Sequence, residues 1–441
     1  MDLNRDNINL LFKKFLIPSV SGAIAIAIYS LIDSIAIGQG VGVNGAAACA
    51  VTLPLFSVGN FISLVFGVGG SVLMSVARGE GKKEKGDAFF MLSCIGAAAV
   101  VAVVWVLEII FQENIYRFFG CDDVIMPYAI GYGKWIIYFL PCLVLPGFLS
   151  CFVRNDGSPK MVMKIIMTGG VINIIGDWLL VFPLDMGIEG AAIATAAGLV
   201  VQSVLMVMYL LSDKCTLSFA KPYKVGKKIK QICSVGFSAG LSKLSVIVVT
   251  FAANNQIMRY LDASALAVYG VLATISSLSI SIFTGIGQAS QPIVASNYGA
   301  GQKDRYWQVF FLALKTTAAF GVACMVLCFA FPVPLATLFI RATDEIVAIA
   351  PYITRVYALS FVPMGMCVLA VLYFQSVMEP SKATKVSLTR SLVMNTVLLY
   401  ALPFIFGGNG IWWAFLMSET IAFALAVIYV KKLYKDYKMS A

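Results

Sequence analysis

The chain has 441 residues, of which 60% are apolar and only 12% are charged, with a formal net charge of +10 and no histidine. Soluble domains carry about a quarter charged residues, so this composition excludes an ordinary soluble protein. Without histidine there is no serine-histidine-aspartate catalytic set, and the ten cysteines form no CxxC pair that would indicate zinc binding. We therefore expect neither an enzyme nor a bound cofactor.

Long apolar windows recur along the whole chain. A helix needs roughly 20 apolar residues to cross a bilayer, whereas barrel strands are about 10 residues long, so these windows favour helices. They predict an all-α membrane protein with twelve spans, at 14–37, 46–76, 88–111, 127–153, 161–183, 187–211, 232–258, 264–294, 306–331, 346–377, 383–406 and 408–430.

The basic residues gather in alternate connections between these windows. Most of them lie at 78–85, 154–164, 214–230, 303–305, 382–385 and 431–438, and the intervening connections are nearly free of them, with Arg117, Arg259 and Arg341 as the exceptions. Lysine and arginine mark the cytoplasmic loops of membrane proteins, so we expect both termini in the cytoplasm of a multi-pass protein in the plasma or inner membrane. This pattern explains the positive charge without a nucleic-acid partner.

An internal repeat appears when the chain is shifted by roughly 220 residues. GVGGSVLMSVARGEGKKEKG at 67–86 aligns with GIGQASQPIVASNYGAGQKD at 285–304. Two halves that each start on the same side indicate six-helix bundles related by a pseudo-two-fold axis along the membrane normal. The predicted division is an N-terminal bundle at 1–211, a basic linker at 212–230 and a C-terminal bundle at 231–441.

Two acids, Asp33 and Asp177, lie inside apolar windows of the first half. A charge at membrane depth costs roughly 2.5 to 3.5 kcal/mol, and such residues usually serve ion or substrate pathways. The repeat places Ala253 opposite Asp33 and Leu399 opposite Asp177. The acids are not duplicated, which favours an ion or proton site confined to the first half.

Two further polar residues fall near these acids. Asn173 precedes Asp177 by one helical turn, and Thr195 lies at a similar depth in the next window. Carboxylate, amide and hydroxyl oxygens suit a small hard cation, and two neighbouring carboxylates can instead share a proton. The alternative is that these residues form polar contacts between helices, as is common in membrane bundles.

Four motifs in order resemble the multidrug and toxic compound extrusion (MATE) transporters over nearly the whole chain. They are YSLIDSIAIGQGVG at 29–42, the run from RNDGSPK through NIIGDWLLV to MGIEGAAIAT at 154–195, QPIVASNYGAGQ at 291–302 and GIWWAFLMSE at 410–419. The resemblance implies two bundles around a V-shaped cleft, alternating access, and export of amphipathic, often cationic compounds in exchange for Na⁺ or H⁺.

The resemblance also assigns roles to individual residues. It implies a cation or proton site, with Na⁺ as one possible ion, at Asp33, Asn173, Asp177 and Thr195, with Tyr132 lining it and Pro18 bending the first helix. Some branches of the family carry acids in the seventh and tenth helices. Here the seventh has Lys243 and the middle of the tenth has no acid, which agrees with a site in the first half.

Lys243 lies near the membrane midplane, where an ammonium group needs a partner. Glu419 and Arg390 fall at similar depths in the same half, which predicts a Lys243–Glu419–Arg390 cluster. The alternative is that Lys243 faces the cleft, where it would repel cationic or attract anionic substrates.

The favoured function is therefore a cation-coupled antiporter for xenobiotic and multidrug efflux, working as a monomer. Its partners would be small amphipathic molecules and membrane lipid, and its coupling ion H⁺ or Na⁺. A lipid-linked saccharide flippase of the same superfamily is the nearer alternative, and an ion channel the farther one.

Overall fold

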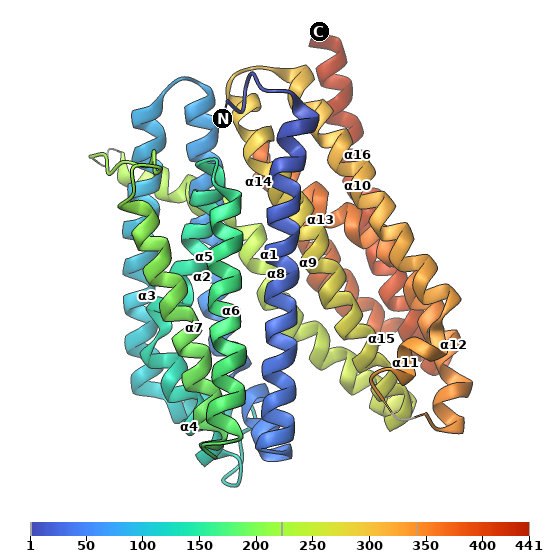
Figure 1. Cartoon of the computed structure of the whole chain (residues 1–441). Helices are drawn as coiled ribbons and strands as arrows, with labels where there is room; N and C mark the ends of the chain where they lie inside the picture. The colour runs from blue at the N-terminus through green and yellow to red at the C-terminus, as the bar shows by residue number, and fades with distance from the viewer. Residues whose placement is uncertain (1, 222–223, 341, 441) are drawn as a thin grey trace.

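A computed structural model describes residues 2–221, 224–340 and 342–440, and it is almost entirely helical (Figure 1). The first half contains α1 (Ile8–Gly40), α2 (Val43–Gly79), α3 (Lys83–Phe118), α4 (Met126–Tyr138), α5 (Leu140–Asn155), α6 (Pro159–Val181) and α7 (Gly187–Leu210). The second half contains α8 (Val225–Tyr260), α9 (Ala263–Gly299), α10 (Lys303–Ala330), α11 (Pro332–Thr337), α12 (Asp344–Ala358), α13 (Phe361–Ser376), α14 (Pro380–Leu388), the π-helix η1 (Thr389–Val393), α15 (Met394–Phe406), the 3₁₀ turn η2 (Gly407–Asn409) and α16 (Gly410–Ser440).

Local signals in the sequence begin and end several of these helices. The Asn7 and Asp262 side chains accept hydrogen bonds from backbone N–H groups in the first turns of α1 and α9, and Thr343 caps α12 in the same way. Gly407, with a φ of 65°, ends α15 in a conformation that favours glycine.

The helices of the described residues account for the twelve predicted crossings. Eight single helices are long and apolar enough to span, as is the joined α12–α13 segment, while α4 and α5 form one span broken by a 53° bend. The stretch Pro380–Met439 has 60 residues, about 90 Å of helix, which is too long for one crossing. It reverses at η2 and crosses twice (Figure 1).

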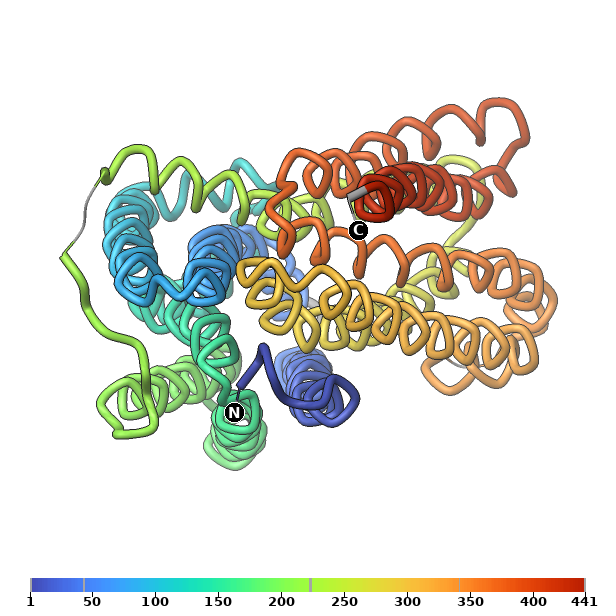
Figure 2. The backbone as a smooth tube through the Cα atoms, turned by 90° about the horizontal axis from the view of Figure 1, so that it is seen from above, coloured from blue at the N-terminus to red at the C-terminus, as the bar shows by residue number. Residues whose placement is uncertain are grey.

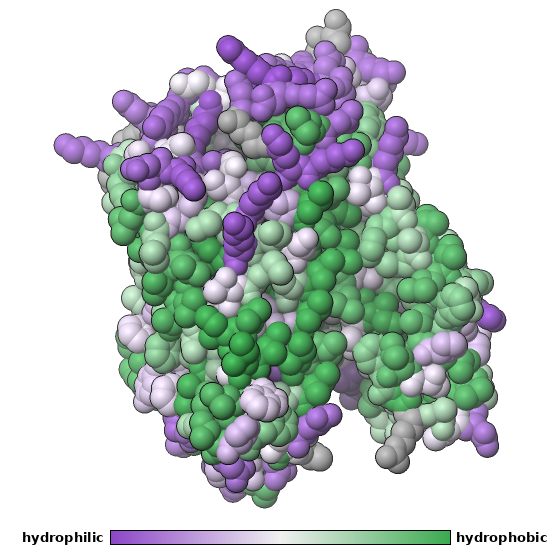
Figure 3. All heavy atoms as spheres, viewed as in Figure 1, coloured by the Kyte–Doolittle hydropathy of each residue, from purple (hydrophilic) through white to green (hydrophobic). Residues whose placement is uncertain are grey.

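The spans form two lobes that lie side by side, α1–α7 in the N-lobe and α8–α16 in the C-lobe (Figures 1 and 2). Both termini lie on the same side of the molecule, called here the terminal side (Figure 1). Hydrophilic residues cover that side, and the flanks are hydrophobic (Figure 3). The repeat is visible in α2 and α9, which are both 37 residues long and end at the aligned Gly79 and Gly299.

Glycines let the two lobes approach closely near the terminal side. A Cβ on Gly79 would lie 2.0 Å from the carbonyl oxygen of Ser296, and a Cβ on Gly299 would lie 2.0 Å from that of Val76. The contact is reciprocal, so the repeated glycines meet each other's helices across the pseudo-two-fold axis. Small residues permit this kind of backbone approach in membrane bundles.

A second glycine contact joins α2 to α8. A Cβ on Gly69 would lie 2.1 Å from the carbonyl oxygen of Ile232, and one on Gly236 would lie 1.9 Å from that of Val65. We call the α2 contacts with α8 and α9 the glycine seam. It places the lobe contact toward the terminal side and leaves the other ends of the lobes free to diverge.

Adding a methyl group to the seam should destabilise the protein. We expect Gly79→Ala and Gly299→Ala to lower the melting temperature in detergent, by about 1 to 3 kcal/mol in stability, because backbone must move to admit each Cβ. Gly270→Ala in α9 is the matched control, since its Cβ would meet nothing within 4 Å. Equal melting temperatures for all three variants would contradict tight packing at the seam.

The helix α1 of the N-lobe packs against the cores of both lobes. Its first half packs Leu11 and Phe12 into a C-lobe core with Ile293, and its second half packs Ile37 into an N-lobe core with Tyr132. Pro18 lies between these parts and lacks the N–H that would bond to the carbonyl of residue 14, which makes this a weak point of the helix. The helix is continuous through Pro18 in this structure, and its bending stays a prediction.

The residues before α1 also contact the C-lobe. Asn297 Nδ2 donates to the Leu3 carbonyl at 2.9 Å, and Arg305 Nη2 donates to the Asp6 carbonyl at 2.7 Å. The start of the chain is therefore fastened to the turn between α9 and α10.

Candidate functional site

Three helices of the N-lobe bring the four predicted oxygen ligands together. Asp33 comes from α1, Asn173 and Asp177 from α6, and Thr195 from α7. Thr195 Oγ1 donates to Asp33 Oδ1 at 3.4 Å, and Asn173 Nδ2 donates to Thr195 Oγ1 at 3.2 Å. The Asp177 carboxyl group lies near that of Asp33. The four residues therefore form one cluster.

Small residues allow these helices to approach each other. A Cβ on Gly176, beside Asp177, would lie 2.8 Å from the Ala194 side chain, beside Thr195. About one helical turn after Thr195, Gly198 of α7 packs on the backbone of Gly169 of α6. Close packing of α6 on α7 at these points sets the separation of the polar side chains between them.

Several oxygens of the cluster lack a hydrogen-bond donor. Both carboxylate oxygens of Asp177 and Oδ1 of Asn173 are buried without a partner among the described residues, and the Asp177 residue is only 1% exposed. A buried unpaired acceptor is costly, and a bound cation or proton would relieve that cost. The donor set therefore fits a small cation or a shared proton, as the residue types predicted.

Tyr132 of α4 covers one side of the cluster. Its buried ring packs against Phe56 of α2, with 6.2 Å between ring centroids, and its hydroxyl lies beside Thr195 and the two carboxylates. Tyr132 therefore lies at the edge of the cluster, at the place that the resemblance implied.

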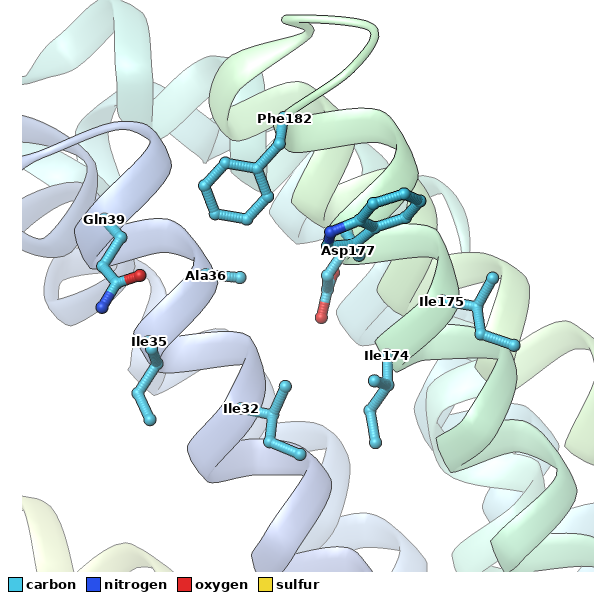
Figure 4. A pocket seen from close by; sticks show the side chains of 9 residues that line it. Ile32, Ile35, Ala36, Gln39, Ile174, Ile175, Asp177 and Phe182 are labelled. Carbon is cyan, nitrogen blue, oxygen red and sulfur yellow. The ribbon is translucent and has the colours of Figure 1, made fainter.

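A pocket between α1 and α6 reaches the cluster. It has a volume of about 390 Å³, and Asp177 is its acidic lining residue among mostly apolar ones that include Ile32, Ile174 and Phe182. Figure 4 shows the Asp177 carboxylate pointing from α6 into the space toward α1. Asp177 thus lines this pocket, although both of its carboxylate oxygens are buried.

Two polar residues beneath the cluster were missed from the sequence. Tyr29 lies one turn before Asp33, and Gln202 lies two turns after Thr195, on the same helix faces. Their side chains interact, and Gln202 is buried. Helical spacing from Asp33 and Thr195 was the signal that could have found them.

A third intramembrane acid, Glu108 of α3, was also missed. It is 4% exposed, and its Oε2 has no hydrogen-bond partner among the described residues. Tyr116, two turns further along α3, accepts a hydrogen bond from Gln112 and lies near this acid. An acid inside an apolar window was the signal, the same one that identified Asp33.

The three predicted charges of the C-lobe do not form one cluster. Arg390 Nε donates to both carboxylate oxygens of Glu419, at 2.9 and 2.8 Å, and this pair is largely buried. Lys243 forms no ion pair with either residue in the described structure. The predicted triad is therefore corrected to a pair, Arg390 with Glu419, and a separate lysine.

Comparison with known proteins identifies the same two halves. The MatE family model matches residues 18–179 and again residues 239–401. "Multidrug export protein MepA" of Staphylococcus saprophyticus is 27% identical over 424 residues, which cover 96% of this chain and 93% of that protein. MepA of Staphylococcus aureus strain MSSA476 is 25% identical, with the same coverage.

Solved structures share the fold. A MATE protein in the straight conformation superposes with a TM-score of 0.91 at 21% identity, covering 99% of this chain and 98% of that one. The outward-facing structure of a multidrug resistance MATE transporter gives 0.90 at 22% identity, covering 98% of each chain. These likenesses confirm the predicted all-α fold of two six-helix lobes.

Proposed function

Because the chain belongs to the MatE family of membrane transporters, we propose that it exports amphipathic compounds in exchange for Na⁺ or H⁺. The predicted class, a multi-pass transporter and not an enzyme, is confirmed by the family match. The MepA relatives are named for multidrug export, which supports drug-like compounds as substrates.

The buried oxygen cluster of the N-lobe carries the coupling part of this proposal. Its Asp177 oxygens lack donors, and Asp177 lines the pocket between α1 and α6. Binding a cation or proton here would neutralise buried charge and change how α1 packs on α6. We assign the coupling ion to Asp33, Asn173, Asp177 and Thr195.

The helix α1 supports a route from this ion to the C-lobe. Asp33 lies in the part of α1 that packs in the N-lobe, while Phe12 and Phe15 lie in the C-lobe core beyond Pro18. An ion bound at Asp33 would shift the part of α1 that follows Pro18. Through Pro18, this shift would act on the part of α1 that packs against the C-lobe. Coupling requires that ion and substrate bind the two conformations with different affinities.

The charge pattern supports the orientation. The basic connections and both termini share the terminal side, which we propose faces the cytoplasm. The glycine seam closes the lobes toward this side, so the cleft would open outward. We also propose a monomer, with lobes at 1–211 and 231–441 and a linker at 212–230, of which residues 222–223 lie outside the described part.

Proteoliposomes test this function directly. Purified protein would be reconstituted, and movement of a fluorescent amphipathic dye measured under an imposed Na⁺ gradient, an imposed H⁺ gradient, or neither. We expect dye transport with one gradient only, which identifies the ion. Ion flux without dye would indicate a channel, and translocation of a labelled lipid-linked saccharide without dye transport would indicate the flippase.

A further inference from the structure

Lys243 lies halfway along α8, on the face that points toward α2. It follows Gly236 by seven residues, which is two helical turns, and Gly236 packs directly on the α2 backbone at Val65. One turn before Lys243, Gly240 still contacts Phe61 of α2. Lys243 is therefore the next residue on this face after the glycine seam, where the lobes begin to separate.

The surroundings of Lys243 are those of a cleft. Lys243 is exposed, although it lies in the middle of a helix long enough to span the membrane. Thr250 and Asn254 continue the same face at the next turns of α8, and both are exposed. A lipid-facing surface at this depth would be apolar, as it is at Val248 and Phe251 about a third of a turn away. Figure 3 shows a hollow between the lobes on the side away from the termini, and the polar face, which continues beyond the glycine seam, lies toward it.

The adjoining wall of this space is polar and uncharged. On α9, Thr274, Ser277 and Ser281 follow the face that ends at Gly285, whose Cβ would lie 2.9 Å from the Val20 backbone of α1. The spans 46–76 of α2 and 264–294 of α9 contain no charged residue, and 232–258 of α8 contains only Lys243. One positive charge thus dominates the electrostatics of these three walls.

In the part of the chain that the structure describes, no acid pairs with Lys243. Both carboxylate oxygens of Glu419 accept hydrogen bonds from Arg390, so this acid is paired with Arg390 and not with Lys243. Among the described residues, no carboxylate lies within 4.0 Å of the Lys243 ammonium group. An ammonium group in a narrow cleft loses part of its hydration, and an anionic partner recovers more energy there than in bulk water.

We propose that Lys243 binds the acidic group of the exported compound, so that the transporter prefers amphipathic acids and zwitterions to permanent cations. This inference rests on the proposed export function and narrows its substrate class. A carboxylate, sulfonate or phosphate would contact the ammonium group, and the apolar body of the compound would lie against the flanking apolar residues Val246 and Ile247. The same charge would repel a quaternary ammonium compound.

Binding to the purified full-length protein in detergent is the first test. The probes are a fluorescent amphipath with one carboxylate, its methyl ester, and a quaternary ammonium analogue of the same size. We expect the native chain to bind the acid about tenfold or more tightly than the ester, which is the usual strength of a hydrogen bond to a charged group. In Lys243→Gln, acid and ester should bind equally, whereas Lys243→Arg should keep the preference.

Two controls make the result interpretable. Lys315→Gln removes an exposed lysine from α10, on the face opposite its buried residues, and should leave all three affinities unchanged. Unchanged ester binding by Lys243→Gln shows that this variant is folded. The proposal is overturned if the native chain binds acid and ester equally, or if Lys243→Gln keeps the preference for the acid.

Transport separates this inference from the function on which it rests. If no probe moves in proteoliposomes under any gradient, export fails, whereas the binding preference still reports on Lys243. If the ester moves under a gradient and the acid has no advantage over it in KM, export stands and the role of Lys243 is refuted.

Discussion

Replacing Asp177 by asparagine is expected to reduce gradient-driven transport to the level of vesicles without protein. The amide has nearly the same shape as the carboxyl group, but it cannot take up or release a proton and attracts a cation far less. The buried site loses a charge that no donor compensates, so folding should not suffer. The measurement is dye movement in proteoliposomes under the productive gradient, with melting temperature in detergent as the folding check.

Further variants define the site. Asp33→Asn should have the same effect, because Asp33 shares the cluster through Thr195. Asp123→Asn is the matched control: the same substitution in the same lobe, at an exposed carboxylate paired with Arg117. Transport that persists in both cluster variants would refute the assigned site and make Glu108 the next acid to replace.

Breaking the Arg390–Glu419 pair should cause the largest loss of stability. Arg390→Met would leave the Glu419 carboxylate, 5% exposed, without its cation. Removing one partner of a buried pair typically costs about 3 to 5 kcal/mol, whereas replacing both by apolar residues is close to neutral. We therefore expect a sharp fall in melting temperature for the single variant and recovery in Arg390→Met combined with Glu419→Met.

An exposed pair provides the comparison. Arg117→Met breaks the contact with Asp123, whose side chain is 86% exposed, and should cost no more than about 1 kcal/mol. If the single Arg390 variant and the double variant melt at the same temperature, Glu419 does not depend on Arg390, and the pair has no coupling energy.

The amino-acid sequence by itself determined the class of protein, its twelve spans and the residues of the candidate ion site. Hydropathy is a local property, so windows such as 88–111 and 232–258 could be recognised without knowledge of their neighbours. The repeat also pairs Gly79 with Gly299, since the two glycines stand at matching places in the aligned segments. Asp33 and Asp177 stood out because a membrane penalises isolated charge wherever the helix lies.

Only the tertiary structure decided which side chains face each other. Lys243 and Glu419 lie at similar depths, but depth along a helix does not specify the direction in which a side chain points, and the structure pairs Glu419 with Arg390 instead. For the same reason Tyr29 and Gln202 became part of the site only when α1, α6 and α7 were packed together. The sharing of α1 between lobes also depends on distant contacts, because a hydropathy window shows that a helix spans and not which lobe it packs against.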